Sequence, residues 1–290
     1  MFSRRNSSNK ISNVRFQIVH RTAYKYVTPV RDSSNDIRLR PCSNEDQTVE
    51  FFALDVEPAT NSSEYHDIFA NAVHHFDQFE PHDTLVFESR LVMATHPREP
   101  LSFEAMPWPL ERIDDAVRMA RCYDFLHPSQ YVDCEPETWR MAIDASASHF
   151  DVWQTSLALM RFVHGHLSYR PGATTAQTHM RDALIQRAGV CQDFAHVMIG
   201  LCRALRIPAL YVSGYLATET ASATHAWTEV YIPGAGWRGL DATHNCVTDA
   251  NYVKIAVGRD YADVPPISGH YRGTRNRTME VSVNVTKLSA

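Results

Sequence analysis

The sequence has 290 residues, of which 44% are hydrophobic and 21% are charged, a composition typical of a soluble globular protein with room for two domains. The formal net charge of -5 excludes a protein whose overall charge attracts nucleic acid. The six cysteines show no C-x-x-C spacing, which argues against a zinc ribbon and against a dense disulfide scaffold.

Residues 1–12 are polar and basic, so we expect a disordered tail before the first strand. This N-terminus lacks the apolar core of a signal peptide, and no run of about 18 apolar residues occurs that could span a membrane. We therefore expect a cytoplasmic protein that binds neither nucleic acid nor a membrane. The sequence does not indicate its oligomeric state.

Residues 13–96 show the alternation of apolar and polar residues that is typical of strands. Val14, Phe16 and Ile18 alternate with other residues, and the pattern returns at 52–56. Successive side chains of a strand point to opposite faces, so such alternation places the apolar set on one face. Because no helical period occurs in this range, the pattern predicts an all-β, sandwich-like N-terminal domain.

Prolines at 97, 100, 107 and 109 predict a linker over 97–112. Helical periodicity follows the linker, and after Pro208 the apolar period changes to two. Helices followed by antiparallel strands predict an α+β domain over 113–290.

The most informative stretch of this second domain lies around Cys191. Residues 182–187 predict a short helix ended by a left-handed Gly189, and the apolar spacing from Phe194 to Leu205 predicts a second, buried helix. Cys191 falls in the first turn of that helix, where free backbone N–H groups and the helix dipole favour a thiolate. Cys191 is therefore a candidate nucleophile, although a buried cysteine is more often a small core residue.

A cysteine nucleophile needs a base, and the base needs a group that orients it. His225 begins one strand of a predicted hairpin and Asp241 ends the other, with the turn at 233–236 near the middle. The two side chains should therefore lie side by side at the same end of the hairpin. This geometry predicts His225 as the base and acid, with Asp241 as its orienting carboxylate.

Several blocks of the chain resemble the transglutaminase-like superfamily in its bacterial two-domain form. In the second domain these are GVCQDFAH at 189–196, IPALYVSGY at 207–215, THAWTEVYIPGAGWRGLDATHN at 224–245 and GRDYADVPPISGHYRG at 258–273. In the first domain, HRTAYKYVTPV and EPHDTLVFES resemble the N-terminal region that accompanies this core.

The resemblance implies a papain-like α+β core, with helices packed on an antiparallel sheet. It also implies that Cys191 is the nucleophile, His225 the general base and acid, and Asp241 the orienting residue. Ala242 stands where the family often has proline, a departure that leaves the carboxylate in place.

Other roles around the site are less strongly indicated. The backbone N–H of Cys191 is a natural donor to an oxyanion, and Tyr169 and Gln192 are candidates for a side-chain donor. Trp227 and Trp237 flank the hairpin and are candidates for substrate contact, although tryptophans in such positions are more often core residues.

These residues predict attack of Cys191 on an amide or ester carbonyl of a peptide, a protein or a small amide, which leaves an acyl-enzyme. Water would complete a cysteine peptidase or amidase, our preferred interpretation, and an amine would complete an acyltransferase. A peptide-binding scaffold without catalysis is a third hypothesis. We expect no cofactor and no metal, because the chain lacks a D-x-[DN]-x-[DN]-G calcium loop. We assign His196 and His244, which lie nearby in sequence, no catalytic role.

Overall fold

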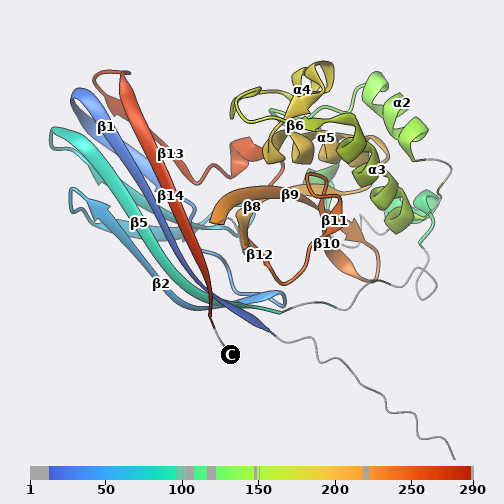
Figure 1. Ribbon diagram of the computed structural model, residues 1–290, viewed down its shortest axis with the longest axis horizontal. Coiled ribbons are helices and arrows are strands. Elements are labelled where there is room, and N and C mark those ends of the chain that lie inside the picture. Colours follow the sequence, from blue (N-terminus) through green and yellow to red (C-terminus); the bar gives the residue numbers. More distant parts are fainter. Residues whose placement is uncertain are drawn as a thin grey trace, which may run out of the picture.

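The fold is described from a computed structural model, in which a β-rich region lies beside a region of helices and a second sheet (Figure 1). The predicted tail at 1–12 and most of the predicted linker lie outside the described residues. None of the described helices is both long and apolar enough to cross a lipid bilayer. The residues that the structure describes are 13–96, 98, 101, 108–115, 122–146, 149, 151–217 and 222–288.

The N-terminal region is built around one long strand, and the prediction of an all-β unit is confirmed. This strand, β1, pairs with β5 on one side and, through its last residues, with β4, giving the order β2-β5-β1-β4-β3. Tyr24 and Val30 of β1 share a buried cluster with Phe76 of β4 and Phe87 of β5. The strands are β1 (Val14–Ile37), β2 (Gln47–Glu57), β3 (Ser62–His66), β4 (Ala72–Gln78) and β5 (His82–Thr95).

The C-terminus returns to this first sheet. Strand β13 (Ile267–Arg272) pairs with the end of β1, and β14 (Arg277–Leu288) pairs with β1 from Tyr26 back to Arg15. The range 113–290 that we expected for the second domain therefore ends in strands of the first. The pairing satisfies backbone groups on an edge of β1 that would otherwise be open, a demand that no local pattern in the sequence reveals.

The helices lie between the two sets of strands in the sequence. Asp151 caps α3, because its carboxylate accepts hydrogen bonds from the N–H groups of Trp153 and Gln154. The described helices are α2 (Pro136–Ala145), α3 (Val152–His166), α4 (Met180–Gln186) and α5 (Cys191–Ala204), with short 3-10 turns η1 (Leu110–Arg112), η2 (Tyr123–Leu126) and η3 (Tyr261–Asp263).

The end of α4 differs from the prediction. Arg187, and not Gly189, adopts the left-handed conformation, with φ 51°. Gly189 lies in the two-residue strand β7 (Ala188–Gly189), which pairs with β6 (Ser168–Tyr169). A Cβ atom at Gly189 would lie 2.5 Å from the Asp193 side chain, so close packing and not backbone conformation requires glycine here.

The second sheet has five antiparallel strands in the order β11-β10-β9-β8-β12, and the predicted α+β layout is confirmed. The predicted hairpin is present, with Gly236 opposite Ile232 across the turn. The strands are β8 (Ala209–Ala217), β9 (Ser222–Ile232), β10 (Gly236–Asp241), β11 (Cys246–Val247) and β12 (Tyr252–Gly258).

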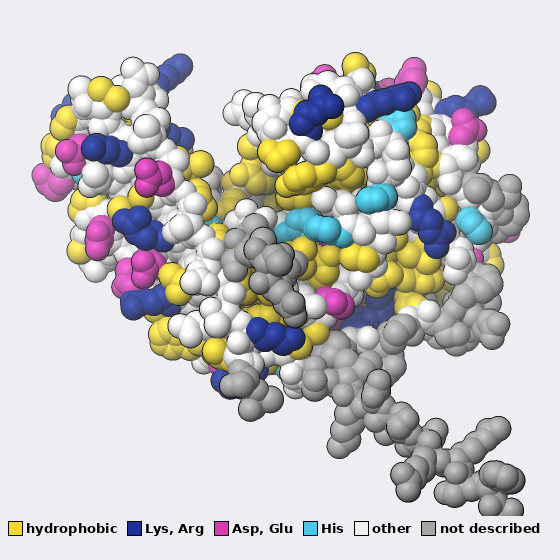
Figure 2. Space-filling model, in the orientation of Figure 1, with side chains coloured by type: hydrophobic (Ala, Val, Ile, Leu, Met, Phe, Trp, Pro, Cys, Tyr) yellow, Lys and Arg dark blue, Asp and Glu magenta, His cyan; other side chains and the backbone are white. Residues whose placement is uncertain are grey.

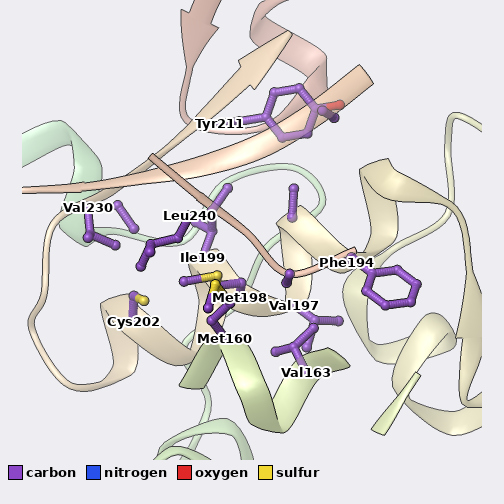
Figure 3. Close-up of a cluster of buried hydrophobic side chains, with 14 of the residues drawn as sticks. Met160, Val163, Phe194, Val197, Met198, Ile199, Cys202, Tyr211, Val230 and Leu240 are labelled. Carbon is purple, nitrogen blue, oxygen red and sulfur yellow. The ribbon is translucent and has the colours of Figure 1, made fainter. Parts of the chain in front are cut away.

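Helix α5 lies in the centre of the core, between α3 and the sheet. Figure 3 shows Val197, Met198 and Cys202 of α5 among side chains of α3, such as Met160, and of the sheet, such as Val230. Cys202 is fully buried there. The apolar stripe predicted from Phe194 onward therefore anchors the helix whose first residue is Cys191.

Two amide side chains of the N-terminal region bind the outer edge of β12. Gln47 donates from Nε2 to the Lys254 carbonyl at 2.7 Å and accepts from the Lys254 N–H at 3.1 Å. Asn71 makes the same pair of bonds with Val257, at 2.7 and 2.8 Å. The N-terminal region thus holds the second sheet directly.

Candidate active site

Cys191 is the first residue of α5, and its loop is held by Asp193. The Asp193 carboxylate accepts the Val190 N–H at 2.7 Å and the Thr174 hydroxyl at 2.6 Å. Burial raises the pKa of Asp193, while these hydrogen bonds act in the opposite direction. Cys191 is partly exposed, whereas Cys202 on the same helix is inaccessible. The loop therefore presents one thiol of α5 to solvent.

His225 and Asp241 form a buried pair at the end of the β9–β10 hairpin. His225 Nε2 lies 2.7 Å from Asp241 Oδ2, which leaves Nδ1 for the Cys191 sulfur. Burial by itself lowers the pKa of His225, but hydrogen bonds with Asp241 and Cys191 outweigh it and raise the pKa to about 9. The imidazole is therefore positively charged at neutral pH, between a carboxylate and a sulfur.

Asp241 is fully buried and saturated with hydrogen bonds. Its Oδ2 accepts His225, His244 Nδ1 at 2.7 Å and the Tyr252 hydroxyl at 2.8 Å. Its Oδ1 accepts the N–H groups of Thr243 at 2.8 Å and His244 at 3.2 Å. Burial raises the pKa of this carboxyl, but the bonds with His225, His244 and Tyr252 hold it well below its usual range. Asp241 therefore stays ionised beside His225.

Sequence reasoning missed His244 and Tyr252 as partners of Asp241. An aspartate that caps a turn can bond the residue three positions later, which is the signal that could have indicated His244. Tyr252 belongs to β12, on the other edge of the sheet, and no local pattern indicates its contact. Among the described residues, His225, Asp241 and His244 bring ligand atoms within 4.8 Å of one another, close enough to hold a metal ion. Both histidines bond to Asp241 Oδ2, so a hydrogen-bond network explains the cluster.

The two candidate oxyanion donors occupy different environments. Tyr169 is mostly exposed, and burial together with the nearby Cys191 raises the pKa of its phenol. Gln192 is nearly buried, and its Nε2 donates to the Ala176 carbonyl at 3.0 Å. The amide of Gln192 thus holds the loop before Cys191, while Tyr169 is exposed and interacts electrostatically with Cys191.

The two predicted tryptophans both line a cavity of about 510 Å³. Trp227 is nearly buried and stacks near His225, with ring centres 6.2 Å apart. Trp237 packs edge-on against Phe125 and Tyr231. In the view of Figure 2, histidine side chains lie among hydrophobic ones on the surface of the region with the helices.

Two family profiles match the chain. The profile of the bacterial transglutaminase-like N-terminal region matches residues 16–94, and that of the transglutaminase-like superfamily matches residues 144–242. An uncharacterised protein of Mycobacterium leprae is 33% identical over 285 residues, which cover 95% of this chain and 99% of the relative.

A solved structure from Cytophaga hutchinsonii, described as that of a candidate cysteine protease, has a TM-score of 0.77 and 26% identity, covering 96% of this chain and 92% of its own. A protein-glutamine gamma-glutamyltransferase of Pseudomonas aeruginosa is 31% identical over 132 residues, which are 40% of this chain and 20% of that protein.

Proposed function

The chain belongs to the transglutaminase-like superfamily, and on that basis we propose that it is a cysteine amidase or peptidase that works through Cys191, His225 and Asp241. The observation that carries the proposal is the buried His225–Asp241 pair, 2.7 Å apart, whose remaining ring nitrogen is available to the thiol at the start of α5. A histidine with only a structural role does not require contact with both a buried carboxylate and a cysteine thiol.

In the proposed resting state, the sulfur carries the negative charge and His225 the positive one. The charge on Asp241 and the N-terminus of α5 both favour this state. Cys191 attacks the carbonyl carbon of the substrate. The oxyanion that forms accepts hydrogen bonds from the Cys191 N–H and from the Tyr169 hydroxyl. His225 then gives its proton to the leaving amine, and a thioester remains on Cys191.

His225 is neutral after the amine departs, and it next removes a proton from water. The resulting hydroxide equivalent attacks the thioester, the carbonyl re-forms and the thiolate leaves as the acid product departs. Asp241 keeps the same ring orientation throughout, because its Oδ2 stays bonded to His225 Nε2 while Nδ1 exchanges protons.

Acyl transfer to an amine is the second candidate, supported by the similarity to the gamma-glutamyltransferase of Pseudomonas aeruginosa. The two reactions share Cys191, His225 and Asp241 and differ only in what attacks the thioester. The residues of the triad therefore favour neither acceptor.

The test uses p-nitrophenyl acetate as the acyl donor, with and without an excess of glycine methyl ester. A hydrolase should release acetate as the main product in both mixtures, and a Cys191→Ala variant should release none above background. If N-acetyl glycine methyl ester is the main product, the hydrolase proposal is wrong and acyl transfer takes its place. Equal turnover by the wild type and the Cys191→Ala variant would reject both, and a Cys202→Ala variant is the matched control for loss of a thiol from α5.

A further inference from the structure

The cavity that Trp227 and Trp237 line lies between the N-terminal sheet and the second sheet. Its volume of about 510 Å³ is in the range of sites for small ligands or short peptide segments. Trp227 and Tyr252 form part of its wall, and these residues stack near His225 and bond to Asp241, respectively. The cavity therefore shares a wall with the proposed catalytic triad.

Most charged groups around this cavity are already paired. Lys254 Nζ lies 2.6 Å from Glu229 Oε1 in a largely buried ion pair. Arg98 forms ion pairs with Glu45 at 2.5 Å and with Asp46. These pairs match Lys254, Glu229, Arg98 and Asp46 of the lining, and the Asp249 carboxylate accepts two hydrogen bonds from Asn251.

Arg238 is the exception among the described residues that line the cavity. Its Nε and Nη1 atoms are buried and have no hydrogen-bond partner. Burial and the neighbouring Arg98 lower its pKa, and the acidic Asp46 and Glu45 act against this. A guanidinium nevertheless stays protonated at neutral pH. Arg238 as a whole is half-buried, but buried N–H groups without an acceptor are costly and are typical of a site that a ligand completes.

A second hydrogen-bond donor in the cavity lining also lacks a partner. The indole Nε1 of Trp227 is buried and has no partner. The ligand must therefore supply acceptors, and a carboxylate matches the two parallel N–H groups of a guanidinium. Trp153, Leu157 and Trp237 line the same cavity and offer apolar surface to the rest of the ligand.

We propose that Arg238 binds the free carboxylate of the substrate, so that the enzyme prefers peptides or small amides that carry one. Arg238 precedes Asp241 by three positions on β10, so their backbones lie about 10 Å apart along the strand and their side chains leave opposite faces of the sheet. The backbone distance equals the length of about three extended peptide residues. The long Arg238 side chain nevertheless lines the same cavity as Trp227 and Tyr252, which contact His225 and Asp241. The proposal rests on the proposed function, since it places the scissile amide at Cys191 and the carboxylate at Arg238.

The test measures binding and not turnover, in a Cys191→Ala background. The probes are benzoyl-glycyl-glycine and its C-terminal amide, which differ only in the carboxylate, and the method is isothermal titration calorimetry. We expect the acid to bind roughly 10- to 100-fold more tightly than the amide, as charge-assisted hydrogen bonds predict. Arg238→Met should abolish this difference, Arg238→Lys should keep part of it, and Arg140→Met, an exposed arginine of α2, should keep all of it.

Equal affinities for the acid and the amide, or failure of both to bind, would overturn the proposal, and neither result depends on the variants at position 238. A preference for the acid that persists in Arg238→Met would also overturn it, provided that the melting temperature shows a folded protein. Because Cys191 is absent from all of these proteins, loss of the proposed catalysis would leave this result unchanged, and the two proposals fail separately.

Discussion

Replacing Asp241 with Asn keeps the shape of the side chain but removes the charge that stabilises the protonated His225. A pKa of about 9, against an ordinary value of 6.5, corresponds to about 3 kcal/mol in favour of the imidazolium. Without the carboxylate, burial lowers the pKa, and we expect a neutral His225 at pH 7. Part of the 3 kcal/mol comes from Cys191, so alkylation of Cys191 by iodoacetamide at pH 7 should slow on the order of 100-fold.

The same substitution should change how stability depends on pH. The pKa of His225 is higher in the folded protein than in the unfolded chain, so the stabilisation is fully present below pH 6.5. It is lost as the pH rises from 6.5 through about 9. The free energy of unfolding of the wild type, measured in guanidinium chloride, should fall over this window. The Asp241→Asn variant should lack this part of the slope.

The matched control is Asp36→Asn, which removes a different histidine–aspartate contact. His75 Nδ1 lies 2.9 Å from Asp36 in the N-terminal sheet. This variant should alkylate at Cys191 at the wild-type rate. The reasoning is refuted if Asp241→Asn also alkylates at the wild-type rate at pH 7 and keeps the wild-type slope of stability.

Two further predictions follow from the contacts of the site, and a third follows from the expectation that no metal is needed. His244→Ala removes one of the hydrogen-bond donors to Asp241 Oδ2, so the carboxylate interacts more strongly with His225. The alkaline limb of the pH–activity profile should therefore move to higher pH, by less than about one pH unit. A shift to lower pH would contradict this. Asp193→Asn weakens the hydrogen bond to the Val190 N–H, so the free energy of unfolding measured in urea titrations should fall by about 1–2 kcal/mol. Labelling of Cys191 should also become slower. Unchanged stability would show that the carboxylate is dispensable. Turnover should persist in excess EDTA, and loss of activity that calcium restores would disprove the expectation of no metal.

The parts of the site that the sequence predicts are those set by local patterns. Helical spacing predicts α5 and places Cys191 at its start, and alternation around a turn predicts the hairpin that pairs His225 with Asp241. Each of these depends on residues within one or two neighbouring elements. Their geometry follows from the regular periods of helices and strands.

The parts that the sequence does not predict depend on contacts between distant segments. Strand β14 reads as one more strand of the second domain until its pairing with β1 is seen. Arg203 of α5 carries a charge, yet it is buried and donates to the backbone carbonyls of Phe125, His127 and Arg259, contacts about which the sequence gives no expectation. Every residue has a backbone carbonyl whatever its side chain, so no pattern of residue types in the sequence predicts which carbonyls accept these hydrogen bonds.

The most direct test of the account is to identify where an acyl group is attached during turnover. The enzyme is mixed with p-nitrophenyl acetate, quenched in acid within the first turnover and digested, and the acetylated peptides are found by mass spectrometry. We predict acetylation of Cys191 in the wild type and none at Cys191 in a His225→Ala variant. Acetyl groups spread equally over the partly exposed cysteines, or an unmodified Cys191 in an enzyme that turns over, would contradict the account.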